Sequence, residues 1–465
     1  MTQRPVADLL ERARRLEGAG QDEPAKAAYI ELLKIDPCHF AALNELGSLA
    51  LSTGHRSAAQ TAYTRAVHCH PDNPIGRVNL GNVLFEDGDF AGALEQYQAA
   101  AASKGDLAEA HQGLARTLEQ MGDARAAEPH WRLGFAGQRV VRQRYRGRGR
   151  AIPALLLVSI KPGNIPTRQI LDSRTFETAA IYAEFYDSAE ALPAHAVVFN
   201  GIGDADLCRA GLERAQALLS RTAAPVINVP QRVRATGRAE NARRLGQLPD
   251  VVAPSIRRLT RAALAGAADL AFPLLLRAPG FHTGQHFVRV ETRAQLAGAA
   301  DTLPGEEVLA IEYLDARGAD GMARKYRVMM IDGALYPLHL AISSDWKVHY
   351  FTANMAADAN HRVEEGRFLA DMEGVLGPRA MRALSRIAKT LGLDYAGIDF
   401  ALRNDGAVLL FECNANMAIV PPDADPMWDY RRQAISRVIE AAKLMIVARA
   451  HANREGADAN GGPIL

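Results

Sequence analysis

The sequence is poor in cysteine, in net charge and in long apolar runs, and each deficit excludes a class of protein. Four cysteines in 465 residues are too few and too scattered for a disulfide scaffold or a zinc cluster, which needs paired ligands at short spacing. Lys and Arg number 54 against 53 Asp and Glu, so the chain lacks the global positive field of a general nucleic-acid or anionic-membrane binder. No apolar stretch is long enough to span a bilayer, and the first residues form no secretory signal. We therefore expect a cytoplasmic protein of about three domains with local electrostatic interactions.

Glycine recurs every 34 residues in the first part of the chain. Each of these glycines is followed after five residues by alanine and after nine by an aromatic residue, and Pro37 and Pro71 come at the predicted ends of second helices. The pattern predicts helix, glycine turn, helix, with the small residue allowing close approach of two helices. The glycines are Gly20, Gly54, Gly88 and Gly122.

This pattern resembles the tetratricopeptide repeat family over roughly residues 6–139, with four repeats of which the first is degenerate. The resemblance implies an all-α superhelix whose concave face binds a peptide or protein. The alternative is an array that only docks on its own C-terminal part. The expected groove residues are Asn44, Ser48, Val78, Asn82, Gln112 and Arg116.

An arginine-rich segment ends the repeats. Residues Arg132–Arg150 carry seven arginines and no acid, which favours a solvated linker over an RNA or phosphate contact. Beyond it, apolar runs of strand length (155–160, 196–199, 225–229) alternate with expected helices at 174–185 and 206–221, which predicts a parallel α/β sheet. Polar glycine turns at 162–164 and 200–206 would follow its strands, and the dinucleotide and P-loop glycine motifs are both lacking.

Residues 395–417 predict a hairpin that carries chemistry. A two-residue turn at Asp405-Gly406 pairs residues whose numbers sum to 811, so Asp399 lies opposite Glu412, and Asn414 shares the face of Glu412. Facing carboxylates repel unless a cation separates them, and hard oxygen ligands suit Mg²⁺, or Mn²⁺ in its place. The alternative is a solvated surface hairpin. The expected core residues on its opposite face are Ile398, Phe400, Leu409, Phe411 and Cys413.

At these residues the chain resembles the ATP-grasp superfamily, over about residues 152–445. Asp399, Glu412 and Asn414 match its metal triad in type and spacing. The strand 272–277 and the loop after it resemble the strand and flexible loop that cover ATP phosphates, with Arg277 and Arg238 where the family usually has lysines. The resemblance implies an α/β plus α+β fold and phosphate contacts at Arg238, Arg277, Gly280, Thr283 and Gly284.

Three further segments follow the same resemblance. Residues 307–314 resemble the interlobe hinge, which implies adenine contacts at Glu312, Tyr313 and Leu314. A second Asp-Gly hairpin at 332–333 follows Arg327, which matches an arginine near the transferred phosphate in RimK-type enzymes, although Lys325 stands where those enzymes have aspartate. Lys347, and more weakly His349, would contact an acyl phosphate.

The implied protein is an ATP-dependent carboxylate–amine or carboxylate–thiol ligase, with a repeat module that recruits a peptide or protein. Two alternatives are a catalytically inactive nucleotide-binding scaffold and an ATP-grasp kinase. The expected domains are a repeat domain at 1–139, a basic linker at 140–151, an α/β subdomain at 152–235, an ATP-grasp domain at 236–450 and a tail at 451–465.

Overall fold

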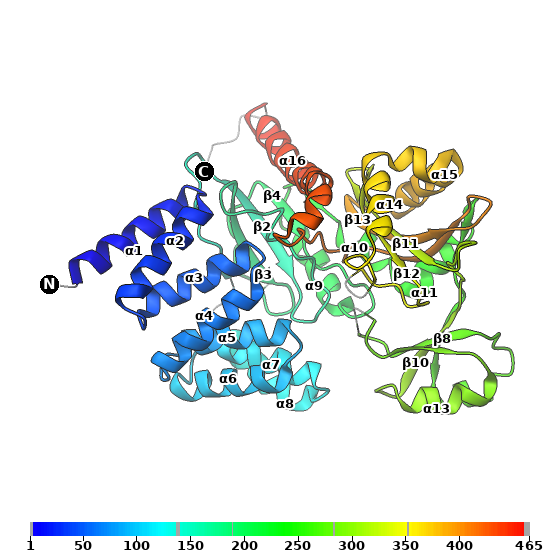
Figure 1. The fold of residues 1–465 in the computed structure, drawn as a ribbon, viewed down its shortest axis with the longest axis horizontal. Helices are drawn as coiled ribbons and strands as arrows, with labels where there is room; N and C mark the ends of the chain where they lie inside the picture. The colour runs from blue at the N-terminus through cyan, green and yellow to red at the C-terminus, as the bar shows by residue number, and fades with distance from the viewer. Residues whose placement is uncertain (1–2, 136–139, 188, 282–283, 351–352, 460–465) are drawn as a thin grey trace. The chain divides into compact units, whose positions relative to one another are not determined.

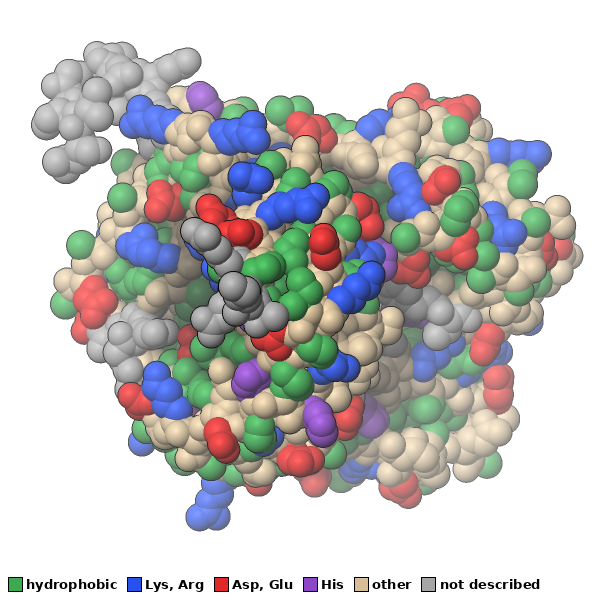
Figure 2. Space-filling model, turned by 60° about the vertical axis from the view of Figure 1, so that its left-hand side comes forward, with side chains coloured by type: hydrophobic (Ala, Val, Ile, Leu, Met, Phe, Trp, Pro, Cys, Tyr) green, Lys and Arg blue, Asp and Glu red, His purple; other side chains and the backbone are tan. Residues whose placement is uncertain are grey.

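A computed structural model describes residues 3–135, 140–187, 189–281, 284–350 and 353–459 (Figure 1). The chain divides into two compact units, Met1–Val141 with Tyr145–Arg150, and Arg142–Arg144 with Ala151–Leu465. The division falls within the arginine-rich segment. Figure 2 shows positive, negative and apolar side chains interspersed over the face in view, in keeping with the near-zero net charge.

The described part of the first unit contains eight helices in four pairs. Each pair is joined at a glycine in the left-handed region, with φ between 77° at Gly20 and 91° at Gly122, a conformation that costs glycine little because it has no Cβ. The prediction of helix, glycine turn, helix is confirmed. The helices are α1 (Gln3–Gly18), α2 (Asp22–Ile35), α3 (Phe40–Ser52), α4 (Arg56–Cys69), α5 (Pro74–Glu86), α6 (Phe90–Ser103), α7 (Ala108–Gln120) and α8 (Ala124–Phe135).

The repeated small and aromatic residues fill the space between helices. Tyr97 of α6 is fully buried and packs so closely against α5 that a Cβ on Gly81 would lie 2.8 Å from its ring. Val78 is also buried there, with 7% of its surface exposed, so the prediction that Val78 lines an open groove is wrong. Its buried cluster includes residues of α6 and of α7, so the side chain packs among helices and does not face solvent. Gln112 donates to the carbonyl of Gly134 and therefore packs α7 on α8.

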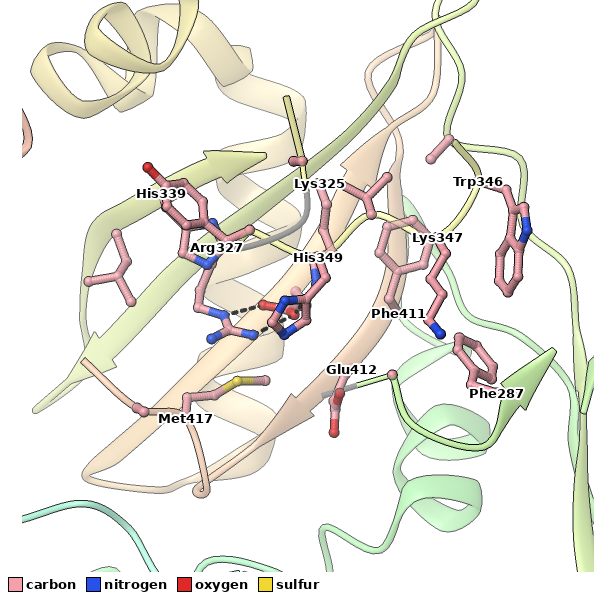
Figure 3. Close-up of a pocket in the computed structure, with 18 of the residues that line it drawn as sticks. Phe287, Lys325, Arg327, His339, Trp346, Lys347, His349, Phe411, Glu412 and Met417 are labelled. Carbon is pink, nitrogen blue, oxygen red and sulfur yellow. Dashed lines mark hydrogen bonds and ion pairs between the residues drawn. The ribbon is translucent and has the colours of Figure 1, made fainter. Parts of the chain in front are cut away.

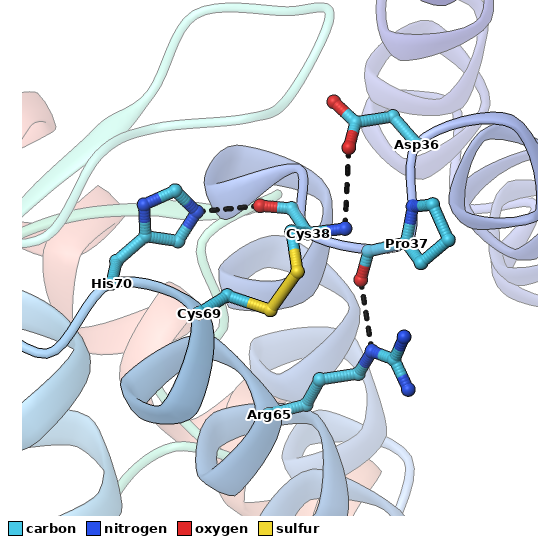
Figure 4. Close-up of a disulfide and its surroundings, with 6 residues drawn as sticks. All are labelled: Asp36, Pro37, Cys38, Arg65, Cys69 and His70. Atoms are coloured by element: carbon cyan, nitrogen blue, oxygen red, sulfur yellow. Dashed lines mark hydrogen bonds between the residues drawn. A yellow bond between two sulfur atoms is a disulfide. The ribbon is translucent and has the colours of Figure 1, made fainter.

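A disulfide joins the first two helix pairs (Figure 4). Cys38 follows α2 and Cys69 ends α4, and the bond closes a sequence separation of 31 residues. Beside it, Arg65 donates to the carbonyl of Pro37 at 2.8 Å. This single pairing was not predicted from the sequence, and it forms because stacking of successive repeats brings the ends of α2 and α4 together.

The segment Tyr145–Arg150 returns to the first helix pair. Arg146 forms an ion pair with Glu17 of α1, and Glu17 also accepts a hydrogen bond from the buried Tyr29 hydroxyl. Arg142, Arg144, Arg148 and Arg150 are exposed, as expected of a solvated segment.

The second unit begins with a parallel sheet whose strands within this unit have the order β3-β2-β4-β5, and β1 falls at the division between the units. Strand β2 runs parallel to both β3 and β4, and β4 runs parallel to β5, which confirms the predicted parallel α/β arrangement. The helix expected at 174–185 is wrong, since Phe176–Tyr182 form β3 and lie mostly buried beside β2 despite their alanine content. The elements are β1 (Val140–Arg142), β2 (Ile152–Val158), β3 (Phe176–Tyr182), β4 (Val197–Asn200), β5 (Val226–Ile227), α9 (Arg209–Leu219), α10 (Pro230–Arg234) and α11 (Arg238–Leu245).

The second sheet is four-stranded and antiparallel, in the order β7-β10-β8-β9. Leu264 of α12 and Leu296 of α13 pack on the buried side chains of β8, β9 and β10, so these two helices cover one face of the sheet. The elements are β7 (Ile256–Thr260), α12 (Arg261–Gly266), β8 (Leu274–Arg277), β9 (Phe287–Val290), a short 3-10 helix (Arg293–Gln295), α13 (Leu296–Asp301) and β10 (Glu307–Glu312).

The third sheet is five-stranded, in the order β12-β11-β13-β14-β6, with α14, α15 and α16 packed on it. No helix among the described residues is long and apolar enough to cross a membrane. The elements are β6 (Val251–Val252), β11 (Ala323–Ile331), β12 (Ala334–Ser343), α14 (Ala359–Ala370), α15 (Met372–Leu391), β13 (Tyr395–Leu402), β14 (Val408–Asn414), a 3-10 helix (Pro426–Trp428) and α16 (Asp429–Ala459).

Both predicted hairpins are present, but one has a different turn. The β11–β12 turn is the expected two-residue type, with φ of 50° at Asp332 and 82° at Gly333. The β13–β14 turn has three residues, since Arg403 N donates to the carbonyl of Ala407 and Gly406 N donates to the carbonyl of Arg403. Pairing beside this turn is therefore shifted by one residue.

A bulge at Phe411 cancels that shift. Phe400 pairs with Leu410, whereas the next pair is Asp399 with Glu412, as predicted. The side chain of Phe411 consequently lines a pocket, so its expected place in the core on the opposite face is wrong. Cys413 is buried, as expected.

Candidate functional site

A pocket of about 580 Å³ lies between the second and third sheets of the second unit (Figure 3). Its volume is in the range of small-molecule sites. We divide its lining into three parts. The hinge end comprises Ile256, Leu275, Phe287, Ile311, Glu312–Leu314 and Trp346. The cationic belt comprises Arg238, Arg277, Lys325, Arg327 and Lys347, with His349 and the triad Asp399, Glu412 and Asn414. The inner chamber comprises Leu338, His339, Tyr350, Met355, Met417, Val420, Pro421, Pro422, Trp428 and Arg431.

The order of these parts is visible in Figure 3. Phe287 and Trp346 lie at one side of the view, with ring centroids 5.4 Å apart, and His339 and Met417 lie at the other. Lys325 and His349 lie between them, and Arg327 lies beside His339, its partner across the strands. Charged side chains thus extend from the middle of the pocket to the side of His339.

Asp399 is held by two cations at the centre of the belt. Its oxygens accept from Arg327 Nε at 2.5 Å and Nη2 at 2.7 Å, and Lys325 Nζ is 3.1 Å away. Burial would raise the pKa of Asp399, but Arg327 and Lys325 outweigh it and hold that pKa well below its usual value. Asp399 is therefore ionised at neutral pH although its side chain is only 4% exposed.

Glu412 and Asn414 form the second anionic point of the belt. Glu412 accepts from Arg238 and, at 2.8 Å, from the side-chain amide of Asn414. Burial raises the pKa of Glu412, but Arg238 and Arg277 reverse the shift and lower it. Burial, with repulsion from Arg238, lowers the pKa of Arg277 to about 10, so Arg277 stays charged at neutral pH.

The pocket collects most of the residues singled out from the sequence. Eleven of the thirteen predicted site residues line it: Arg238, Arg277, Gly284, Glu312, Tyr313, Leu314, Arg327, Lys347, Asp399, Glu412 and Asn414. Gly280 is not in the lining, and a Cβ there would meet Leu207 at 3.2 Å. Thr283 lies outside the described residues.

The loop before β9 approaches Lys347 closely. Gly284 has φ of 75°, and a Cβ there would lie 2.6 Å from Lys347 Cε. A side chain at Gly284 would displace Lys347 from the belt. His349 also lines the belt, and burial together with Lys325 and Arg327 lowers the pKa of His349.

Sequence reasoning missed the inner chamber. Its residues come from the segment 338–356 and from 417–431, which carry no spacing motif, and they become neighbours only through the third sheet and α16. Arg431 illustrates this, because its only distinctive feature is that it is a buried cation near the start of a long helix, and burial is not visible in the sequence. Lys325 was noticed only as a departure from a family pattern, and its ion pair with Asp399 gives it a place in the belt.

The charge of the lining is positive. It contains six Lys or Arg against the four carboxylates Glu312, Asp399, Glu412 and Asp423, so 6 − 4 = +2. A concave site of this kind attracts anions, and arginines can hold phosphate or carboxylate through two parallel hydrogen bonds.

The triad fits a divalent cation in its chemistry. Asp399, Glu412 and Asn414 offer hard oxygens toward one pocket, which are the donors that Mg²⁺ prefers. No group of three or more His, Cys, Asp or Glu able to hold a metal occurs in the described residues, so the amide of Asn414 is needed to complete the set. A bound cation would replace N–H donors that now hold Asp399 and Glu412.

Comparison with known proteins identifies only the helical part. Residues 44–108 match the tetratricopeptide repeat family, which indicates a protein–protein interaction module. No curated protein matches the chain. The remainder is a mixed α/β region with three sheets.

Solved structures similar to this chain include MamA and a tetratricopeptide repeat protein. A crystal structure of MamA protein is 20% identical, with a TM-score of 0.27, and the match covers 28% of this chain and 72% of that one. MamA from Desulfovibrio magneticus RS-1 is 20% identical over 29% of this chain and 77% of that one, with a TM-score of 0.26. A tetratricopeptide repeat protein from Parabacteroides merdae is 20% identical over 29% and 54%, with a TM-score of 0.27.

Proposed function

We propose that the pocket binds ATP and that the protein is an ADP-forming ligase of the ATP-grasp type, which activates a carboxylate as an acyl phosphate. The observation that carries the proposal is the order of the lining, with an apolar end beside a backbone strand, then a belt of five cations facing a triad of oxygen ligands. Adenine needs apolar faces and backbone hydrogen bonds, whereas a triphosphate needs converging cations. The pocket offers an apolar surface with backbone groups and a cluster of cations next to each other.

The hinge end suits the base. Leu275 and Ile311 offer apolar walls from two strands of the second sheet, and Glu312, Tyr313 and Leu314 present backbone at the point where β10 ends. The ladder ends at Glu312, whose N–H donates to the carbonyl of Ser255, so the backbone of Tyr313 and Leu314 beyond it can pair with the adenine edge. The sequence-based assignment of adenine to this segment stays a proposal.

The belt suits phosphoryl transfer to a carboxylate. A carboxylate oxygen of the substrate attacks the γ-phosphorus, the bond from that phosphorus to the β,γ-bridging oxygen breaks, and ADP leaves. An amine then attacks the acyl carbon, phosphate departs and the nitrogen loses a proton. Arg238, Arg277, Arg327 and Lys347 would hold the phosphate oxygens in line and offset their charge.

Mg²⁺, or Mn²⁺ in its place, would be held by Asp399, Glu412 and Asn414 and would supply charge neutralisation to the phosphates. Lys325 would remain beside Asp399 as a fixed positive charge. The role of the protein is therefore positioning and electrostatic stabilisation.

The test is an ADP-release assay of the full-length chain over a panel of carboxylates and amines, with mass spectrometry of the products. We expect Glu412→Ala to lower Mg²⁺-dependent ADP formation by about 10²-fold or more, since it removes a negatively charged ligand. The matched control is Glu240→Ala, an exposed glutamate on α11 that pairs with Arg243 and is not in the pocket lining. Unchanged turnover of Glu412→Ala would refute the assignment, and a stable phosphorylated product would indicate a kinase.

A second candidate is a nucleotide-binding scaffold without turnover. The observation that favours it is the saturation of Asp399, whose two oxygens are already held by Arg327 and Lys325. In that case Mg²⁺-ATP raises the melting temperature while no substrate in the panel yields ADP.

The repeat module adds a proposed delivery role. Tetratricopeptide repeats indicate protein–protein interaction, and we propose that they recruit the peptide or protein on which the ligase acts. Deleting residues 1–139 should then lower turnover of that large substrate and leave ATP affinity unchanged. Equal loss of both would mean that the repeats only support the fold.

A further inference from the structure

The inner chamber has a chemistry different from the rest of the pocket. Most of its lining is apolar or aromatic, including Tyr350, Met355, Met417 and Trp428. Met355 and Met417 are almost fully buried, whereas Val420 is 47% exposed at its edge. A nucleotide held at the hinge end and the belt has no need of such walls, so the chamber is suited to another molecule.

One cation is built into the wall of this chamber. The side chain of Arg431 is only 8% exposed, and its guanidinium carbon lies 4.1 Å from the centroid of the Tyr350 ring. Its Nε is 3.3 Å from Oε1 of Glu365, which is fully buried. Arg431 is thus fixed on one edge by an ion pair and on one face by an aromatic ring.

Glu365 is itself fully engaged, which makes Arg431 rigid. Its Oε1 also accepts from Leu340 N at 3.3 Å, and its Oε2 accepts from the hydroxyls of Tyr350 at 3.2 Å and Tyr430 at 2.5 Å. The carboxylate of Glu365 thus interacts with four groups, namely these three donors and the guanidinium of Arg431. No hydrogen bond in the described part of the chain uses the guanidinium of Arg431, and its Nε is a buried atom without a hydrogen-bond partner although the side chain lines the pocket.

A second buried polar atom beside the chamber lacks a partner. His339 is 6% exposed and lines the pocket, and its Nδ1 has no hydrogen-bond partner among the described residues. A buried ring nitrogen and a buried guanidinium that both lack hydrogen bonds point to a polar ligand. A carboxylate matches the guanidinium through two parallel hydrogen bonds.

We infer that the inner chamber binds the substrate of the ligase, and that this substrate is a carboxylate with an aliphatic or aromatic side group. Its carboxylate faces Arg431 and the belt. Its side group packs against Trp428, Met355 and Met417. This rests on the proposed function for the reaction, but the chamber's binding can be measured without it. The same chemistry occurs in a small N-acylated amino acid and in the C-terminal residue of a peptide. The experiment separates these sources.

The chain offers two fluorescent reporters inside the pocket. It has three tryptophans, Trp131 in the helical repeats, Trp346 at the hinge end and Trp428 in the chamber. A variant with Trp131→Phe and Trp346→Phe reports on the chamber, and one with Trp131→Phe and Trp428→Phe reports on the hinge end. The probes are N-acetyl-phenylalanine, N-acetyl-aspartate, a ten-residue peptide ending in phenylalanine and its C-terminal amide.

We expect N-acetyl-phenylalanine or the free-acid peptide to change Trp428 fluorescence saturably, with at least tenfold weaker binding of N-acetyl-aspartate and of the amide. Binding of the free-acid peptide with none of N-acetyl-phenylalanine assigns the substrate to a peptide terminus, and the reverse assigns it to a small carboxylate. No saturable response to either, or equal affinity for N-acetyl-aspartate, would overturn the inference.

Two variants test the chamber itself. Val420→Glu places a negative charge at the edge of the chamber and should weaken N-acetyl-phenylalanine binding at least tenfold, whereas Met427→Glu, also exposed but not in the lining, should leave it unchanged. Equal effects of the two would contradict the assignment. Arg431→Lys keeps the charge opposite Glu365 and loses the paired donors, so it should weaken carboxylate binding about tenfold.

Failure of the inference differs from failure of the proposed function. If Trp346 responds to Mg²⁺-ATP and Trp428 responds to no carboxylate, the nucleotide site stands and the chamber assignment falls. If Trp428 responds and Trp346 does not, the chamber binds a carboxylate and the ligase proposal falls.

Discussion

The pair Arg327–Asp399 allows a quantitative prediction from the geometry of the belt. Arg327→Met removes two hydrogen bonds, at 2.5 and 2.7 Å, from a carboxylate that is 4% exposed. Removing one partner of a buried ion pair typically costs about 3–5 kcal/mol because the other charge is left uncompensated. Lys325 stays 3.1 Å from Asp399 and offsets part of this, so we expect the free energy of unfolding to fall by about 2–3 kcal/mol.

Two further variants show whether the lost stability comes from the unpaired charge. Arg327→Met with Asp399→Asn removes both charges, so it should be about 1 kcal/mol or more stabler than Arg327→Met alone. Lys325→Met leaves the bidentate pair intact and should cost less than Arg327→Met. The measurement is urea unfolding in a Trp131→Phe background, where the fluorescence comes from Trp346 and Trp428 in the second unit.

The dependence on pH gives the pair a second signature. Because the folded-state pKa of Asp399 lies below its unfolded value, the pair's contribution is fully present above pH ~4 and is lost as pH falls toward the folded pKa, by up to about 1.4 kcal/mol per pH unit. Arg327→Met should flatten this part of the profile. Stability equal to wild type at pH 7, or a double variant no stabler than Arg327→Met, would refute the reasoning.

The helical repeats carry two more predictions. Cys38→Ser should lower the free energy of unfolding of the first unit by about 3–4 kcal/mol, because the disulfide closes a 31-residue separation. The measurement is urea unfolding followed by circular dichroism, and the difference from wild type should vanish when dithiothreitol is present. An unchanged difference in reductant would contradict the pairing. Gly81→Ala should cost about 1–3 kcal/mol in the same assay, since its Cβ would lie 2.8 Å from the Tyr97 ring. Gly18→Ala, with nothing within 4 Å, should be neutral or slightly stabilising, and equal effects would show that helix propensity rather than packing decides.

Periodic and short-range features of the fold were predictable from the sequence. The glycine turns of the repeats and the turn at Asp332-Gly333 depend on residues that are neighbours in the chain, and both are as expected. The helix expected at 174–185 failed because its alanine content reports local propensity, whereas burial between strands decides the outcome. The disulfide between Cys38 and Cys69 was not predicted, since a separation of 31 residues indicates no contact until the repeats are stacked.

The facing of Asp399 and Glu412 shows how a correct prediction can rest on an incomplete reason. The two-residue turn assumed at Asp405-Gly406 is a three-residue turn, which alone would have placed Glu412 on the wrong face. The bulge at Phe411 restores the register and also turns Phe411 into the pocket. Bulges change the direction of side chains near functional sites. This bulge leaves two carboxylates facing each other in a belt of cations, and we infer that ligand binding explains this arrangement better than packing does.

The inner chamber could not have been predicted, and the reason bears on what the pocket binds. The belt residues of β13 and β14 follow from one hairpin, and their spacing is fixed by strand geometry. Arg431, Glu365 and Tyr350 come from three separate elements and meet only because α14 and α16 pack on the third sheet. A buried ion pair assembled from distant segments gives little stability by itself, since desolvation offsets its attraction. Its presence at the wall of a mostly apolar chamber is accounted for if Arg431 also holds a ligand, which is why the effect of Arg431→Lys on carboxylate binding is the decisive measurement.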